Sequence, residues 1–154
     1  MTKIDYATAP KGSGSRYPAP FDQPCQGRTW LRLGDAAGLT NFGVNLLRLA
    51  PGVWSSQRHW HALEDEFVFV LKGEVTLVTD AGEQILRSGD SAGFKAGTRD
   101  GHCLQNRSQA DAEILVIGSR NDADYGEYSD IDMKFVAGRY SASVGFHHKD
   151  GTPY

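Results

Sequence analysis

The fold of this chain is decided by residues 59–73, which read HWHALEDEFVFVLKG. On a β-strand, residues i and i+2 point to the same face, so the imidazoles of His59 and His61 would lie side by side, about 6.6 to 7 Å apart at their Cα atoms. The four residues ALED then form a tight turn, and Glu66 begins an apolar strand that returns beside the first. Two imidazoles and a carboxylate oxygen can thus converge on one metal ion.

A fourth candidate ligand, His102, follows one to two hairpins later. Three imidazoles and one carboxylate suit a single divalent ion of Fe, Mn, Ni, Co, Cu or Zn, and the general order of metal affinities does not choose among them. The alternative for the first three residues is a polar surface strand with a solvated acidic turn, and for His102 a hydrogen-bonded core or rim histidine. We interpret Glu64 and Asp65 as the solvated turn itself.

The rest of the chain predicts an all-β fold. It has 154 residues, enough for one domain with its own core, and 18 are glycines, about 12% against a usual ~7%. Short apolar runs cut by turn residues begin at Thr29, and no stretch keeps a helical period over three turns. This spacing is typical of a sandwich or barrel. Residues 1–28 hold four of the six prolines and predict an extended N-terminal arm.

Charge and hydropathy exclude several classes of partner. A net charge of −3 gives no basic surface for nucleic acid or an anionic membrane, and the apolar runs are far shorter than the ~20 residues of a membrane helix. The N-terminus lacks the apolar region of a signal peptide, so we expect a cytoplasmic protein. Cys25 and Cys103 have no CxxC spacing and are predicted to be reduced, with Cys103 in the core. His147 and His148 are predicted to be surface histidines.

These spacings resemble the two motifs of the cupin superfamily. The first motif is matched by Gly52, the HxH pair, Glu66 and Gly73, and the second by Gly89, Lys95-Ala96-Gly97, His102 and Asn106. Six residues separate Gly52 from His59 where the family usually has five, and Lys95 stands where the family has proline. Four residues, 98–101, precede His102 where two are usual. This longer loop would bring Arg99 or Asp100 toward a substrate.

The resemblance implies a cupin-type double-stranded β-helix, or jelly-roll barrel, over residues 29–120. It also implies a metal inside, held by His59, His61, Glu66 and His102. Residues 121–154 would form a C-terminal β extension, one more hairpin outside the barrel. Alternation on the strand after Glu66 places Val68 and Val70 inside and Phe67, Phe69 and Leu71 outside. An apolar outer face of this kind must be covered by the second layer, the arm or another subunit. The resemblance further implies a homodimer, with exchanged N-terminal segments as one form of it.

The resemblance extends to small single-domain metal-binding cupins, and in particular to sugar-phosphate-isomerase-like cupins. It implies a metal-dependent enzyme acting on a small polar metabolite, a sugar phosphate or an oxo-acid, with Glu66 as a metal ligand or as the catalytic base. An Fe(II)-dependent dioxygenase could use the same ligands. A non-catalytic sensor that binds a metal or small ligand is a rival from another class, and a metal-free binding barrel is disfavoured because all four expected ligands are present.

Overall fold

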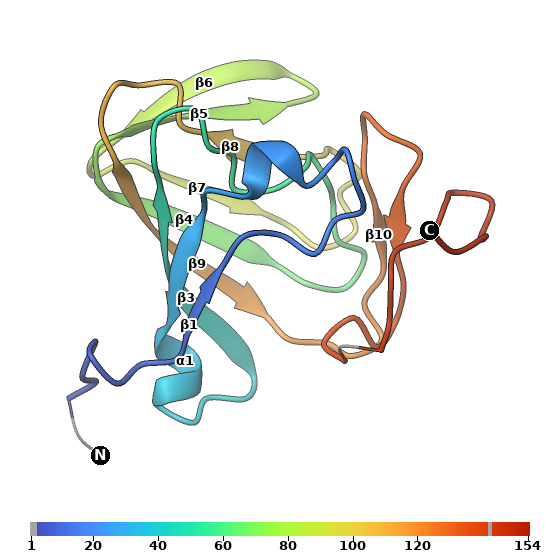
Figure 1. Cartoon of the computed structure of the whole chain (residues 1–154), viewed down its shortest axis with the longest axis horizontal. Helices are drawn as coiled ribbons and strands as arrows, with labels where there is room; N and C mark the ends of the chain where they lie inside the picture. The colour runs from blue at the N-terminus through green and yellow to red at the C-terminus, as the bar shows by residue number, and fades with distance from the viewer. Residues whose placement is uncertain (1–2, 142) are drawn as a thin grey trace.

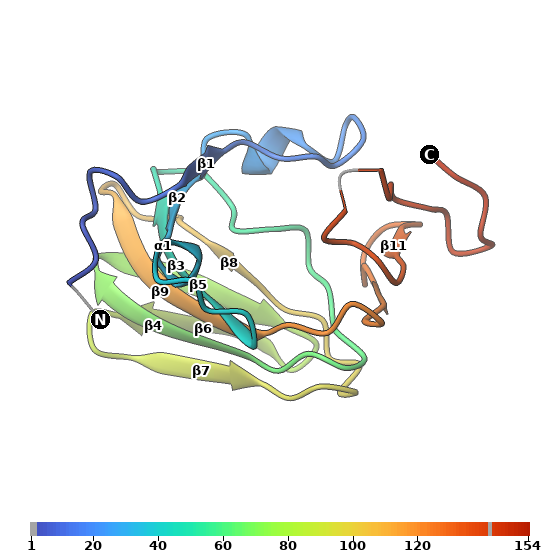
Figure 2. The same cartoon turned by 90° about the horizontal axis from the view of Figure 1, so that it is seen from below.

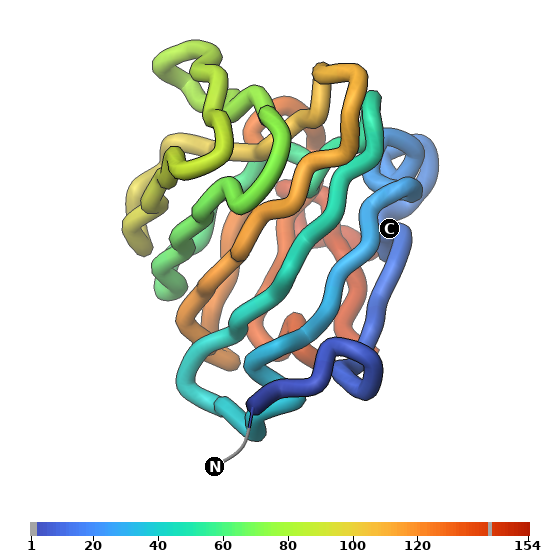
Figure 3. The backbone as a smooth tube through the Cα atoms, turned by 90° about the vertical axis from the view of Figure 1, so that its left-hand side faces the viewer, coloured from blue at the N-terminus to red at the C-terminus, as the bar shows by residue number. Residues whose placement is uncertain are grey.

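Two antiparallel sheets lie face to face in the computed structural model, which describes residues 3–141 and 143–154 (Figures 1 and 2). The larger sheet has the order β1-β2-β3-β9-β4-β7. Its strands are β1 (Lys11–Ser13), β2 (Thr29–Arg32), β3 (Phe42–Leu49), β9 (Ala112–Ser119), β4 (Glu66–Lys72) and β7 (Ser91–Phe94). Figure 3 shows β9, in orange, running between β3 and β4.

The smaller sheet has the order β6-β5-β8, and helical segments are short. Its strands are β5 (Glu74–Thr79), β6 (Gly82–Arg87) and β8 (Cys103–Gln105). The helical segments are the single 3-10 turn η1 (Gln23–Cys25) and α1 (Leu33–Ala36). The predicted all-β barrel is confirmed. None of the described helices has the length and apolar character that crossing a bilayer would require.

The core fills the space between the two sheets. It contains the inward residues of both, namely Leu47, Leu49, Val68, Val70, Val75, Leu77, Leu86, Leu104, Ala112 and Ile114. Alternation along β4 is as predicted, because Val68 and Val70 are buried whereas Phe67 and Leu71 are 42% and 44% exposed on the outer face. Cys103 is buried, as expected of a core residue. Burial of these apolar side chains holds the sheets together.

Glycines close the turns that position the strands. Gly73, between β4 and β5, has φ +80°, and a Cβ there would lie 2.7 Å from the carbonyl oxygen of Asp111. A side chain would therefore clash as well as strain the backbone. This turn sets how β5 leaves the large sheet for the small one.

The N-terminal arm belongs to the large sheet over part of its length. β1 pairs with β2 from Lys11 to Ser13, and Ala9, Leu33 and Leu46 form a small cluster on the outer face of the sheet. Farther along, Tyr17 contacts the tail, with ring centroids 5.4 Å from Tyr128 and 5.2 Å from Phe146. In Figure 2 the arm crosses the top of the view toward the red tail.

The C-terminal tail, residues 121–154, contains the short hairpin of β10 (Gly126–Glu127) and β11 (Lys134–Phe135). The sequence predicts one more hairpin outside the barrel, and β10 and β11 form a two-stranded sheet separate from the two barrel sheets, but side chains of the tail reach the interior. Tyr128, Phe135 and Arg139 line the barrel cavity. The reason is apolar burial, since Tyr128, Met133 and Phe135 form a cluster with the aromatic residues of the arm.

Candidate metal centre

The HxH pair lies on extended backbone that is not a regular strand, contrary to the sequence-based prediction. His59 makes two isolated bridges, one to His102 and one to Tyr128. The backbone of His59 and His102 exchanges two hydrogen bonds, of 3.2 and 2.9 Å. A single-residue bridge on either side cannot extend into a ladder, but it keeps the chain extended, so both imidazoles still point the same way.

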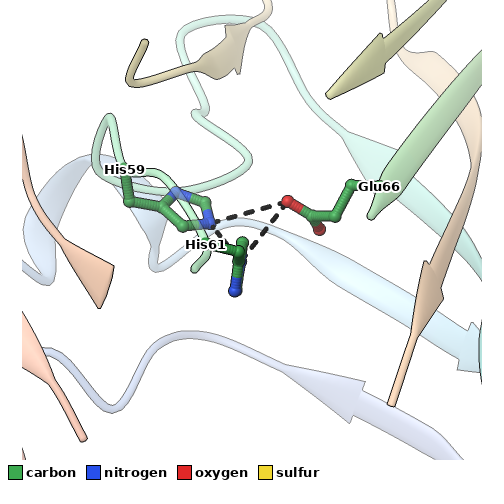
Figure 4. A group of neighbouring side chains, drawn as sticks. All are labelled: His59, His61 and Glu66. Atoms are coloured by element: carbon green, nitrogen blue, oxygen red, sulfur yellow. Dashed lines mark hydrogen bonds and ion pairs between the residues drawn. The ribbon is translucent and has the colours of Figure 1, made fainter. Parts of the chain in front are cut away.

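Three side chains, those of His59, His61 and Glu66, point toward one another (Figure 4). The two Nε2 atoms lie 3.1 Å apart, and Glu66 Oε2 lies 3.4 Å from His61 Nε2 and 3.8 Å from His59 Nε2. Metal–nitrogen bonds of about 2.0–2.1 Å place the ligands of a tetrahedral ion roughly 3.3 Å apart. The donor triangle therefore has the dimensions that a transition metal ion requires.

The outer nitrogens of both imidazoles are already occupied. His59 Nδ1 donates to the carbonyl oxygen of Gln57 at 2.9 Å, and His61 Nδ1 lies 2.6 Å from Asp124 Oδ2, which accepts. Each ring therefore has its Nε2 left to face the other ring. Burial, together with the neighbouring His61 and His102, lowers the pKa of His59 to about 3, so this ring is neutral at pH 7 and its Nε2 carries a lone pair. A cation placed between the two Nε2 atoms, which lie 3.1 Å apart, would be held by both rings.

His102 lies beside this triangle and contacts its carboxylate. Its Nε2 is 2.9 Å from Glu66 Oε2, and its ring stacks on Phe94 with centroids 3.6 Å apart and planes at 3°. Its Nδ1 is buried without a hydrogen-bond partner among the described residues. Burial alone would raise the pKa of Glu66, but the hydrogen bond with His102 and the nearby imidazoles hold that pKa below its usual range. The four predicted ligands are thus brought together, with His102 facing Glu66.

A second carboxylate group lies on the other side of His61. Glu64 and Asp124 are both buried, so the expectation that Glu64 belongs to a solvated turn is wrong; Asp65 is exposed, as expected. The guanidinium of Arg139 pairs with Glu64 and lies 3.5 Å from Asp124, while Tyr140 donates to Glu64 at 2.6 Å. Burial would raise the pKa of Asp124, but hydrogen bonds from His61 and the Leu63 amide lower it.

The histidines and Glu66 form part of the wall of a cavity of about 820 Å³. Five arginines and three carboxylates also line it: Arg16, Arg28, Arg32, Arg120 and Arg139, with Asp35, Glu64 and Glu66. A cavity of this size accommodates a small metabolite. The residues of the arm and the tail in this wall, such as Arg139, were not predicted from the sequence, and neither was Asp124 behind His61, because no spacing motif links them to the histidines.

The two predicted substrate-binding residues, Arg99 and Asp100, do not line this cavity. Arg99 lies over the ring of Trp60, 5.2 Å from its centroid, and Asp100 accepts a hydrogen bond from the Asp80 amide at 2.7 Å. Asp100 does line a second cavity, of about 200 Å³, which shares His61, Glu66 and His102 with the first. Their part in substrate binding stays a prediction.

A family model for the cupin domain matches residues 45–118. The chain is 45% identical to a sugar phosphate isomerase from a cupin superfamily of Silicibacter pomeroyi DSS-3, with 99% of this chain and 96% of that one covered and a TM-score of 0.92. The chain belongs to the cupin superfamily. The predicted membership and the predicted jelly-roll fold are therefore both confirmed.

Two further solved structures resemble this cupin. A candidate sugar phosphate isomerase from Acidithiobacillus ferrooxidans is 28% identical, over 83% of this chain and 80% of that one, with a TM-score of 0.74. A polyketide cyclase from Streptomyces resistomycificus is 20% identical over 77% and 79%, with a TM-score of 0.60, and shares the fold alone. No curated protein matches the chain in sequence.

Proposed function

We propose that this cupin is a metal-dependent enzyme that isomerises a sugar phosphate. One divalent transition metal would be held by His59, His61 and Glu66, with His102 as the fourth ligand. The observation that carries the proposal is the donor triangle of two imidazoles and one carboxylate in the wall of an arginine-lined cavity. The names of the two relatives above, at 45% and 28% identity, support the choice of isomerisation and of a phosphorylated sugar.

The charge of the cavity supports an anionic substrate. The whole chain has a net charge of −3, yet arginines outnumber carboxylates in the cavity wall. A cavity of one sign in a protein of the other concentrates ions of opposite charge and speeds their capture. A phosphate ester fits this field, whereas a neutral sugar gains nothing from it.

Isomerisation of an aldose to a ketose moves one proton between neighbouring carbons and a second from the hydroxyl to the carbonyl oxygen, which requires a base close to the carbonyl group. The bound metal would polarise that carbonyl oxygen. Glu66 is the base in this proposal: Oε2 faces the histidines, and no hydrogen bond to Oε1 is found among the described residues. Its lowered pKa keeps the carboxylate ionised at neutral pH, as both a metal ligand and a general base must be. In the metal-free protein His102 hydrogen-bonds Glu66 and stacks on Phe94, which keeps both side chains beside the metal position.

The experiment combines metal analysis with turnover. Purified protein is assayed for bound metal and then, after loading, with a panel of aldose and ketose phosphates followed by NMR. We expect near-stoichiometric metal, conversion of at least one sugar phosphate, and loss of both in His59→Ala, with the rate falling at least about a thousandfold. His148→Ala is the matched control, because this histidine pairs with Asp132 at 2.9 Å in the tail.

Three outcomes would overturn the proposal. Protein with no transition metal, and no difference between wild type and His59→Ala, would remove the metal site. Metal-loaded protein that binds sugar phosphates and converts none of them would support the sensor alternative. Oxygen consumption with an Fe(II)-loaded protein would support the dioxygenase instead.

We further propose that the protein is a homodimer. Phe67 and Leu71 expose 42% and 44% of their surface on the outer face of β4, and an apolar face of this kind is commonly covered by a partner. Light scattering coupled to size-exclusion chromatography should give twice the monomer mass, and a monomer would contradict this.

A further inference from the structure

The strand register of the large sheet places two chemically different groups on the same concave face. Glu66 on β4 pairs with Gly118 on β9, and Gly118 pairs with Gly43 on β3. Neighbouring strands lie about 4.8 Å apart, so the backbone of Gly43 is roughly 10 Å from that of Glu66. Two of the three positions in this row are therefore glycines.

These two glycines leave the floor of the cavity free of side chains. A Cβ at Gly118 would lie 3.6 Å from Glu66 Cγ, on the metal side. A Cβ at Gly43 would lie 3.5 Å from Nε and one terminal nitrogen of Arg120 and 3.7 Å from Asn45 Nδ2. The floor thus runs from the carboxylate at one end to hydrogen-bond donors at the other.

Other residues of the chain fix the Arg120 guanidinium, which supplies donors at this far end. The guanidinium of Arg120 pairs with Asp35 and donates to the carbonyl oxygen of Leu39 at 3.1 Å, while Nε lies toward Gly43. Anchoring of this kind fixes a guanidinium and lowers the entropy cost of binding a ligand.

Arg32 adds a second cation to this end of the cavity. It pairs with Asn45 in the register of β2 and β3, and both residues line the cavity. Within residues 3–141 and 143–154, no salt bridge to Arg32 is found. Its charge is therefore available to a ligand.

We propose that Asn45, Arg120 and Arg32 form a phosphate-binding subsite that makes the enzyme specific for phosphorylated sugars. This rests on the proposed function and names the residues that recognise the end of the substrate remote from the metal. Guanidinium and amide N–H groups are the donors that suit the oxygens of a phosphate dianion. A sugar with its carbonyl beside Glu66 and its phosphate at the other end of its carbon chain spans the glycine floor.

The test measures binding of inorganic phosphate and of sugar phosphates to metal-loaded protein by isothermal titration calorimetry. We expect Arg32→Gln to weaken phosphate binding about tenfold or more. Arg48→Gln is the matched control, because Arg48 lies on the neighbouring strand β3, is not part of the cavity wall, and pairs with Glu113. It removes the same charge and should leave phosphate binding unchanged.

A second variant tests the geometry without changing charge. Gly43→Ala places a methyl group at ordinary van der Waals distance from Arg120 and Asn45, so the sheet accommodates it while the room for an anion shrinks. We expect the KM for a phosphorylated sugar to rise about tenfold or more, with the metal content unchanged. The unphosphorylated sugar should lose far less in kcat/KM.

The outcomes separate this subsite from the proposed function. Turnover of sugar phosphates that is equally affected by Arg32→Gln and Arg48→Gln would overturn the subsite and leave the isomerase standing. Phosphate binding that depends on Arg32 in a protein with no isomerase activity would support the subsite and refute the isomerase. Phosphate binding that neither Arg32→Gln nor Gly43→Ala weakens would overturn the subsite in either case.

Discussion

The two sides of the His61 imidazole face carboxylates in different surroundings. On the Nδ1 side, Asp124 and Glu64 are buried, and they receive hydrogen bonds from backbone amides and the charge of Arg139. On the Nε2 side, Glu66 faces His59, His61 and His102, and no arginine or lysine pairs with it among the described residues.

This difference indicates which side needs a metal. A buried carboxylate is stable only when paired with a cation or fully hydrogen-bonded. The Nδ1 side meets this condition within the chain, through Arg139. On the Nε2 side the partners of Glu66 are the three imidazoles, with no arginine or lysine among the described residues, so a bound cation would complete it. Both groups hold acidic residues and a histidine, but only one has the character of an incomplete metal site.

The largest effect is expected for His61→Ala, because this substitution removes the ring that both sides share. We expect bound metal to fall to background and activity to fall at least about a thousandfold. Unlike His59→Ala, it should also lower the free energy of unfolding of the metal-free protein, by about 1–3 kcal/mol, because Asp124 loses a buried hydrogen bond. Metal analysis and urea unfolding in EDTA measure the two effects. Equal stability of the two metal-free variants would contradict the assignment of the Nδ1 side as structural.

Arg139→Met tests the charge balance of the Nδ1 side. Glu64 and Asp124 would stay buried without their cation, so we expect the free energy of unfolding to fall by about 3 kcal/mol, while metal content at saturating metal stays near wild type. Arg87→Met is the control, because the pair of Arg87 with Glu74 is exposed and contributes little. Loss of metal without loss of stability would show that Arg139 supports the Nε2 side and not the Nδ1 side.

Asp124→Asn changes the Nδ1 side of His61 and should affect metal binding on its Nε2 side. Asp124 fixes the proton of His61 on Nδ1, and an amide in its place weakens that hydrogen bond and turns the lone pair of Nε2 less firmly toward the metal. We expect metal affinity to fall about 10–100-fold, measured by competition with a chelator. Asp132→Asn is the control, since Asp132 makes a similar contact with His148 in the tail. An unchanged affinity in Asp124→Asn would mean that the backbone alone orients His61.

The Nε2 side could be predicted from the sequence, because its geometry is local. Two residues separated by one on extended backbone share a side, and a short turn returns Glu66 to them, so the spacing alone brought His59, His61 and Glu66 together. His102, the fourth candidate, follows one to two hairpins later and also matches the second motif of the resemblance. The three side chains converge even though the HxH pair lies outside any regular strand, since a bridged extended segment preserves the same alternation.

The Nδ1 side could not be predicted, because its residues meet through the path of the tail. Asp124 and Arg139 reach Glu64 only when residues 121–154 fold back over the cavity, and that path depends on aromatic packing with the arm. The turn ALED has residue types that are typical of a solvated turn, so nothing in its composition indicated that Glu64 is buried. Arg99 shows the converse: it is close to His102 in sequence, but its side chain lies over Trp60.

The smallest effect we predict is a pH dependence that separates the two sides in the metal-free protein. The pKa of His59 is lowered to about 3 from an ordinary value near 6.5, so between these values the unfolded chain holds a proton that the folded chain lacks. Stability is therefore fully present above pH 6.5 and falls as the pH falls, by about 1 kcal/mol per pH unit.

The lowered pKa values of Glu66 and Asp124 act in the same direction but only below about pH 4.5, where carboxylates of the unfolded chain take up protons. Urea unfolding in EDTA between pH 6.5 and 5 thus leaves out the two carboxylates and includes the contribution of His59, which the His59 variant isolates. His59→Gln should flatten that slope, whereas His148→Gln should keep it. If Asp124→Asn flattened the slope in this range as much as His59→Gln, the two sides of His61 would not be separate, and the charge balance assigned to each would be wrong.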